Sequence, residues 1–218
     1  MRPLPLSPEP LVSTTRLVLC ALEPALASAW EEACGGLDFV TVHRGSILEV
    51  SADALVSPAN SFGFMAGGID AAYVRHFGPE LQARVQRMIL EEHHGELLVG
   101  AAGLVETGNE RTPWLIAAPT MRVPAPLPAD SVNAYLAARA VFLLLEHGRM
   151  RSGLTRGPLV SERIRTVAMP GLGTGVGGMP ARVCARQVRA AIDDVLLGGL
   201  KLPASGAEAA ERHRVLAR

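Results

Sequence analysis

The chain has 218 residues, of which 49% are hydrophobic and 19% are charged. This composition excludes a wholly disordered chain and supplies enough apolar side chains for one sizeable core. Lysine plus arginine number 21, as do aspartate plus glutamate, so the net charge is zero and the basic surplus typical of a nucleic-acid-binding protein is absent from the chain as a whole. A local group of arginines within residues 149–165 leaves nucleic acid as a partner not excluded.

The cysteines indicate whether the protein holds a metal or cofactor, and the apolar segments indicate where in the cell it is expected. Cys20, Cys34 and Cys184 form no C-x-x-C pair, so we expect neither a disulfide scaffold nor a metal site, and no cofactor. No basic segment precedes an apolar one near residue 1, and no apolar stretch reaches the roughly 18 to 20 residues of a membrane span. We therefore expect a soluble, cytoplasmic protein without membrane association.

The first half of the chain alternates between strand and helix patterns. Residues 1–15 are rich in proline and are expected to form a loose arm. The apolar runs predict strands, and the segments with apolar residues at helical spacing predict helices. The expected strands are 16–21, 39–45 and 52–60, and the expected helices are 24–34, 70–77 and 79–92.

The second half continues this alternation with longer connections. Two strands are expected at 97–106 and 114–118, and a third at 165–169. Ser131 is a candidate N-cap for a long helix through His147, and a further helix is expected from Ala181 to about Leu197. Residues 148–163 are expected to form an exposed loop, and the segment from Pro203 a frayed helix or a disordered tail.

The alternation of strands and helices predicts the fold class. We expect an α/β fold, a three-layer α/β/α sandwich whose central sheet is mixed and mainly parallel. Residues 16–200 are expected to form one domain and residues 201–218 a C-terminal tail. Ligands of such sheets bind beyond the carboxyl ends of the strands, where two glycine-rich loops of this sequence are expected to lie.

The first of these loops is SPANSFGFMAGGIDAA, residues 57–72, which follows a strand and opens a helix near Gly68. The N–H groups and partial positive charge of a helix N-terminus favour a phosphate. Gly67 and Gly68 allow the backbone to approach a ligand closely, and the Asn60 amide suits a ribose hydroxyl. Asp70 is either a helix-stabilising charge or a carboxylate that acts on a substrate. An N-capped helix after a glycine turn is the alternative interpretation of this loop.

The second loop is PGLGTGVGGMP, residues 170–180, which holds five glycines between a strand and a helix. A string of accessible N–H donors can hold a diphosphate without a lysine. The loop is neither a Walker A loop, which needs G-K-[ST], nor a Rossmann fingerprint. A flexible connector is the alternative interpretation.

Taken together, these motifs resemble the macrodomain family. GSILEVSADALVSPANSFGFMAGGIDAAY aligns without a gap, from Gly45 to Tyr73, with an opening in which G-D-I-T precedes D-A-I-V-N-A-A-N and G-G-G-V-D-G-A-I. TVAMPGLGTGVGGMPARVCA resembles the second signature, P-x-x-G-T-G-x-[YF]-G-[FY]-P. GLVETGNERTPWLIAAP resembles the intervening pair of strands. The resemblance covers residues 38–198.

The resemblance implies that the chain binds ADP-ribose or an ADP-ribosylated substrate. In macrodomains the two loops grip the diphosphate and the distal ribose of ADP-ribose. Ten positions of this chain fall on ligand-binding positions of the family: Ser46, Ile47, Gly67, Gly68, Ile69, Gly173, Thr174, Gly175, Val176 and Gly177.

The resemblance also implies a catalytic pair, Asn60 and Asp70. Asn60 falls on the asparagine that contacts the distal ribose, and Asp70 on the aspartate that hydrolases of the family use to polarise water or orient the ribose. An activated water beside the anomeric carbon would release a carboxylate, an acetate or another acyl group. The chain is therefore expected to be an ADP-ribosyl ester hydrolase. A non-catalytic reader of ADP-ribose and a structural macrodomain without a nucleotide ligand are the alternatives.

Three positions depart from the family pattern. Ser46 replaces the adenine-binding aspartate and lacks its charge, and Gly177 replaces an aromatic residue, which we expect to open the pocket. The I-H-T-V segment is replaced by residues 116–119, after which Arg122 is expected either to reach a phosphate or to lie on the surface. Residues 16–34 fall outside the resemblance and are expected to extend one edge of the sheet.

Overall fold

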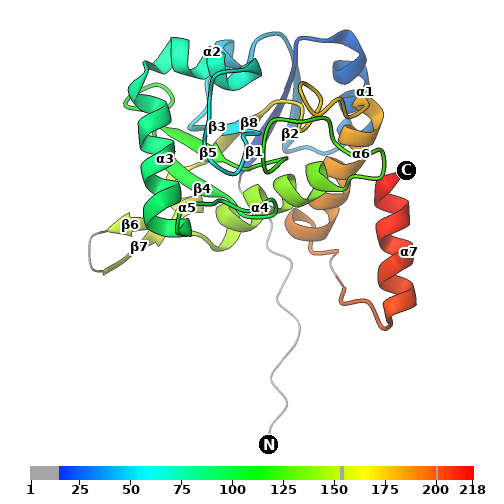
Figure 1. The fold of residues 1–218 in the computed structure, drawn as a ribbon. Coiled ribbons are helices and arrows are strands. Elements are labelled where there is room, and N and C mark those ends of the chain that lie inside the picture. Colours follow the sequence, from blue (N-terminus) through cyan, green and yellow to red (C-terminus); the bar gives the residue numbers. More distant parts are fainter. Residues whose placement is uncertain (1–14, 153–154, 200) are drawn as a thin grey trace, which may run out of the picture.

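A six-stranded sheet forms the centre of the protein in a computed structural model, which describes residues 15–152, 155–199 and 201–218 (Figure 1). The expected arm at 1–15 therefore lies outside the described residues apart from Thr15, which is buried. The strands in spatial order are β2 (Val40–Arg44), β1 (Arg16–Ala21), β8 (Thr166–Met169), β3 (Ala54–Ser57), β5 (Trp114–Ala117) and β4 (Gly103–Glu106).

The sheet is mixed and mainly parallel, as the sequence predicted. Four of its strand pairs are parallel, and only β4 runs antiparallel to its neighbour β5. The carboxyl ends of the five parallel strands consequently meet at one edge of the sheet. The predicted α/β/α fold class is confirmed.

The N-terminal strand lies inside the sheet, which corrects the expectation that it extends an edge. β1 pairs with β2 on one side, where Leu17 is opposite Val40, and with β8 on the other, where Leu17 is opposite Val167. Both faces of β1 are apolar, because Leu19 and Cys20 point to opposite core clusters and are both buried. A strand that is apolar on both faces belongs in the interior of an α/β sheet.

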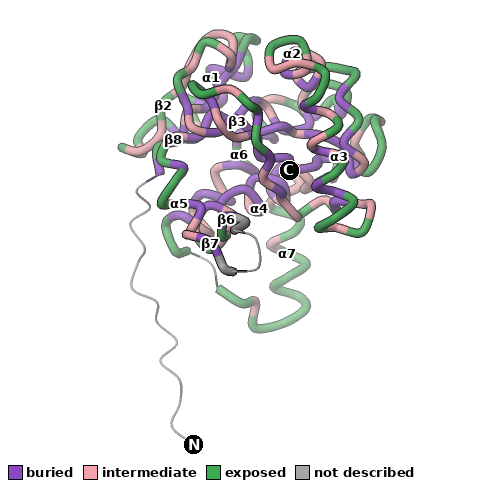
Figure 2. Tube along the Cα trace, turned by 90° about the vertical axis from the view of Figure 1, so that its left-hand side faces the viewer, coloured by how far each residue is buried: buried purple, intermediate pink, exposed green. Residues whose placement is uncertain are grey.

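Helices cover both faces of the sheet (Figures 1 and 2). One core cluster packs α1 (Pro24–Cys34), α4 (Asn133–His147) and α6 (Ala181–Ala191), which the π-helix η2 (Ile192–Leu196) continues. The other cluster packs α2 (Gly68–Phe77), α3 (Glu80–His93) and the short 3₁₀ helix η1 (Ile47–Glu49). Among the described residues, no helix has the length and apolar character needed to cross a membrane.

Residues 148–152 and 155–163, the described part of the expected loop, are structured, so the prediction of an exposed loop was wrong. They form an antiparallel hairpin, β6 (Arg149–Ser152) with β7 (Thr155–Leu159), followed by the one-turn helix α5 (Val160–Arg163). Met150 and Val160 are buried in the core cluster that contains α4. These apolar residues are too few and too irregularly spaced to form a pattern, and tertiary packing decides their structure.

Two element boundaries also differ from the expected ones. The strand expected at 97–106 begins only at Gly103, because Leu97 donates its N–H to Ser61 O and Gly100 adopts φ +95°. Helix α4 begins two residues after Ser131, whose hydroxyl accepts the N–H of Asn133. Ser131 therefore shapes the turn before the helix and is not the N-cap.

The C-terminal segment is an ordered helix, α7 (Gly206–Ala217), which settles the choice between a frayed helix and a disordered tail. Its Arg212 forms an ion pair with Asp194 on η2. Its Leu216 O accepts a hydrogen bond from the buried Gln187 of α6 at 3.0 Å. These contacts fix α7 against the helical layer on that side of the sheet.

Candidate functional site

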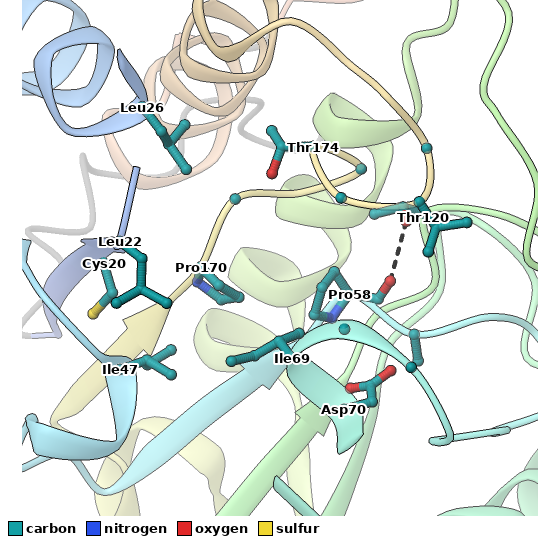
Figure 3. Close-up of a pocket in the computed structure, with 18 of the residues that line it drawn as sticks. Cys20, Leu22, Leu26, Ile47, Pro58, Ile69, Asp70, Thr120, Pro170 and Thr174 are labelled. Carbon is teal, nitrogen blue, oxygen red and sulfur yellow. Dashed lines mark hydrogen bonds between the residues drawn. The ribbon is translucent and has the colours of Figure 1, made fainter. Parts of the chain in front are cut away.

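A pocket of about 530 Å³ lies at the edge of the sheet where the parallel strands end (Figure 3). Segments that follow each of the five parallel strands line it. Because these segments are distant in the sequence but adjacent at the sheet edge, the pocket is a product of the topology.

The predicted ligand-binding and catalytic residues lie together in this pocket. All twelve of them line it: Ser46, Ile47, Asn60, Gly67, Gly68, Ile69, Asp70, Gly173, Thr174, Gly175, Val176 and Gly177. The two glycine loops face one another across it, one after β3 and the other after β8. This arrangement creates a single site between two loops whose glycines expose the backbone.

The first glycine loop presents the N-terminus of α2 to the pocket. Gly67 is the N-cap, and Gly68 adopts φ +56°, a left-handed conformation that glycine takes without strain. The first hydrogen bond of the helix runs from Ala71 N to Gly67 O at 3.2 Å. The N–H groups of residues 68–70 therefore have no acceptor within the helix and are suited to an anion.

The second glycine loop is closed by its own hydrogen bonds. Gly178 N donates to Gly175 O, and Met179 N donates to Gly173 O, each at 2.9 Å. Gly173 adopts φ +72°, which again favours glycine. The loop is therefore a defined turn, and the interpretation as a flexible connector does not hold.

Gly177 does not open the pocket in the way that the sequence suggested. A Cβ atom at Gly177 would lie 2.5 Å from Gly173 O and 3.0 Å from a methyl carbon of Leu127. Leu127 also donates its N–H to Gly177 O at 2.8 Å. Leu127 thus fills the direction in which an aromatic side chain would leave the backbone, and the expected opening is corrected.

Asp70 is a buried carboxylate in the wall of this pocket. Only 7% of the residue is exposed, and its Oδ1 accepts a hydrogen bond from the hydroxyl of Ser57 at 2.6 Å. Burial raises the pKa of Asp70 to about 6, and the Ser57 hydrogen bond acts in the opposite direction. A carboxyl group with such a pKa can accept a proton near neutral pH.

Asn60 lines the pocket while its side chain organises the loop after β3. Its Nδ2 donates to Phe64 O at 2.8 Å, and its Oδ1 accepts from the N–H groups of Phe62 and Phe64, each at 3.2 Å. The amide oxygen is thus engaged within the loop. Since an amide nitrogen carries two hydrogens, one N–H remains for a ligand.

Ser46 and Ile47 lie at the start of η1, directly after β2. The Ser46 hydroxyl accepts the N–H of Leu48 at 3.3 Å, and Ile47 is buried. Arg122, in contrast, does not line the pocket. Its guanidinium pairs with Glu96, with Nε 2.7 Å from Oε1, and lies over the ring of Phe62. The surface alternative for Arg122 is the one observed.

Sequence reasoning missed two parts of the pocket wall. The turn from β1 to α1 contributes Leu22 and Glu23, and α1 contributes Leu26, although residues 16–34 had no assigned role. Phe64, 56% exposed, also lines the pocket. The first part follows from the parallel pairing of β1 with β8, which local sequence does not encode. The exposed aromatic residue within a glycine loop was a signal that the sequence did contain.

Comparison with known proteins identifies the fold family. The profile of the Macro domain family matches residues 56–188. An uncharacterized protein of Aquifex aeolicus is 37% identical over 147 residues, which cover 67% of this chain and 76% of that protein. The O-acetyl-ADP-ribose deacetylase 1 of Pantoea vagans is 30% identical over 142 residues, covering 65% of this chain and 73% of that protein.

Solved structures agree on the fold. The macrodomain of Mycobacterium tuberculosis DarG superimposes with a TM-score of 0.56 and 22% identity over 72% of this chain and 91% of that one. The Oceanobacillus iheyensis macrodomain with ADP gives a TM-score of 0.55 and 21% identity, covering 71% and 74%. With its family match, mixed sheet and facing glycine loops, this chain belongs to the macrodomain family.

Proposed function

We propose that this protein binds ADP-ribose or an ADP-ribosylated molecule in the pocket between its two glycine loops. The N–H groups at the start of α2 and in the loop after β8 would hold the diphosphate. Among the described residues that line the pocket, the charged side chains are the carboxylates Glu23 and Asp70. A diphosphate would therefore be held by backbone donors, without an arginine or lysine.

We further propose that the protein hydrolyses ADP-ribosyl esters. The observation that carries this proposal is the buried Asp70, with its pKa of about 6, in the same pocket as the phosphate-binding loops. Hydrolysis of such an ester at neutral pH needs a group that can take a proton from water. The similarity to a protein named O-acetyl-ADP-ribose deacetylase points to the same class of substrate.

Asp70 would act as the general base of this reaction. Its Oδ1 is held by Ser57, so the other carboxylate oxygen would accept the proton as water adds to the anomeric carbon of the distal ribose. In an ester carried on that carbon, the bond from the carbon to the ester oxygen breaks, and its electron pair leaves with the released carboxylate. The remaining N–H of Asn60 would orient a ribose hydroxyl.

The test is the turnover of a mono-ADP-ribosylated carboxylate peptide and of O-acetyl-ADP-ribose by the wild type and by Asp70→Asn. We expect Asp70→Asn to lower kcat at least about 100-fold, because general-base catalysis contributes on that order, while ADP-ribose still binds. Unchanged turnover would overturn the role of Asp70. In water labelled with ¹⁸O, the released acid stays unlabelled if water attacks the anomeric carbon, and gains label if water attacks the carbonyl.

A non-catalytic reader of ADP-ribose is the second candidate. The engaged amide of Asn60 favours it, because only one of the hydrogen-bonding groups of this side chain is left for a ligand. Calorimetric binding of ADP-ribose by the wild type, with no turnover of either ester, would establish this alternative. A structural macrodomain, in contrast, would show no rise in melting temperature with ADP-ribose.

A further inference from the structure

The pocket has two chemically different ends. At one end lie the polar groups of Asn60, Asp70 and Thr120, whose hydroxyl donates to Pro58 O at 3.1 Å. At the other end, Cys20, Leu22, Leu26 and Ile47 form an apolar wall. Figure 3 shows Cys20, Leu22 and Ile47 on one side of the pocket and Asp70 and Thr120 on the other. A sugar suits the first end, and a flat nucleobase suits the second.

The apolar end is built largely by β1, α1 and the turn between them. The register places Ala21 opposite Arg44, and Gly45 donates its N–H to Ala21 O at 3.0 Å. The turn that follows Ala21 is thus the direct neighbour of Ser46. At this end Leu22 is 75% exposed, while Leu26 is buried. These residues precede the part of the chain that matches the family, residues 56–188.

Glu23 supplies a carboxylate to this end. It occupies the N-cap position of α1, where its carbonyl oxygen accepts the N–H groups of Leu26 and Ala27, each at 3.1 Å. Its side chain makes no capping hydrogen bond, although a carboxylate at this position often does. The Glu23 side chain is exposed and lines the pocket. Ser46 lines the same pocket, and its hydroxyl already accepts a hydrogen bond from Leu48 N.

From this arrangement, and on the basis of the proposed function, we propose that Glu23 selects the nucleobase of the ligand. Its carboxylate accepts an N–H from an exocyclic amine, such as that of adenine, on a base that lies against Leu22 and Ile47. A hydrogen bond to a charged acceptor is stronger than one to a hydroxyl, so Glu23 takes a role that Ser46 performs weakly. The N-terminal strand and helix thereby determine specificity.

The experiment measures calorimetric affinities of two ligands for the wild type, Glu23→Ala and Glu23→Gln. The ligands are ADP-ribose and its analogue with unsubstituted purine, which lacks the exocyclic amine. We expect Glu23→Ala to weaken the binding of ADP-ribose about tenfold and to leave the affinity for the purine analogue unchanged. The affinity of Glu23→Gln for ADP-ribose should lie between those of the wild type and Glu23→Ala, because its uncharged amide oxygen still accepts a hydrogen bond. Glu32→Ala, on the same helix but outside the pocket, is the control and should match the wild type for both ligands.

The outcomes separate this proposal from the one on which it rests. If the wild type binds neither ligand, the proposed function fails. If the wild type and Glu23→Ala bind ADP-ribose equally, Glu23 has no role in selection and only the present proposal fails. An equal loss for both ligands would place the carboxylate on the ribose hydroxyls and would also overturn it. Because Glu23 is exposed, unchanged melting temperatures are expected and verify that the variants fold.

Discussion

Ser57, the last residue of β3, donates its hydroxyl hydrogen to Asp70 in the first turns of α2, and the two oxygens are 2.6 Å apart. Both residues are buried, so this contact fixes one carboxylate oxygen and leaves the other for a water molecule. It also opposes the effect of burial on the pKa of Asp70. Ser57 is therefore a positioning residue for the proposed base, and two predictions follow from this pair.

The first prediction concerns the pH profile of Ser57→Ala. In the wild type, kcat/KM should rise with pH through about 6, because Asp70 must be deprotonated to act as a base. Loss of the Ser57 hydrogen bond removes an interaction that lowers the pKa of Asp70, so the rise should move to higher pH. The measurement is kcat/KM between pH 5 and pH 8. Ser61→Ala, a buried serine outside the pocket wall, should leave the profile in place. An unshifted profile in Ser57→Ala would contradict the coupling.

The second prediction concerns stability. The pKa of Asp70 rises from 3.8 to about 6 on folding, so its charged form is disfavoured in the folded state. Below about pH 4 the carboxyl group is protonated in both the folded and the unfolded state, so it does not lower the free energy of unfolding. As the pH rises to about 6 the free energy of unfolding should fall by about 2 to 3 kcal/mol, at about 1.4 kcal/mol per unit of pKa. Asp70→Asn should remove this loss.

Urea unfolding of both proteins at pH 4.5 and pH 7.5 measures this effect. Asp70→Asn should gain stability relative to the wild type between these pH values, although it loses turnover. Asp53→Asn, whose parent carboxylate directly before β3 accepts the N–H groups of Arg165 and Thr166, should instead lose stability. A stability difference between wild type and Asp70→Asn that is independent of pH would refute the assigned pKa.

The glycine loops could be predicted from the sequence because their signal is local. The requirement for glycine at Gly68 and Gly173 comes from the backbone conformation within each loop. The residues on either side of each loop predict a strand before it and a helix after it. The role of β1 could not be predicted in this way. Its position between β2 and β8 depends on pairing with residues about 150 positions away, which a single sequence does not reveal.

The environment of Gly177 shows the same limit at the level of one side chain. A comparison of motifs identifies a missing aromatic residue and suggests an empty space. The space is filled by Leu127, which lies 50 residues away in a proline-rich connection that carries no periodic pattern. Compensation of this kind depends on three-dimensional packing, whereas the choice of residues for a phosphate-binding loop depends on the backbone alone.

The third prediction concerns the junction of three helices at Gln187. This residue of α6 is fully buried; its Nε2 donates to Ser131 O at 2.7 Å and to Leu216 O at 3.0 Å, and its Oε1 accepts from Tyr135 N. Gln187→Met keeps the volume but leaves these backbone groups without their partner. We expect a loss of about 3 kcal/mol in the free energy of unfolding. Gln86→Met, whose parent makes a partly buried hydrogen bond to Phe62 O at 3.5 Å, should lose less than about 1 kcal/mol.

The last prediction tests whether the second glycine loop faces the ligand. A Cβ atom at Gly175 would meet no atom within 4 Å, and its φ lies outside the left-handed region, so Gly175→Val should fold normally. Since Gly175 lines the pocket, the added side chain should occupy space that the diphosphate needs, and the affinity for ADP-ribose should fall at least about tenfold. Gly36→Val is the matched control, because Gly36 is equally open but lies at the end of α1, outside the pocket wall. If both variants keep their melting temperatures and bind ADP-ribose like the wild type, the diphosphate does not lie against this loop, and the proposed binding mode is wrong.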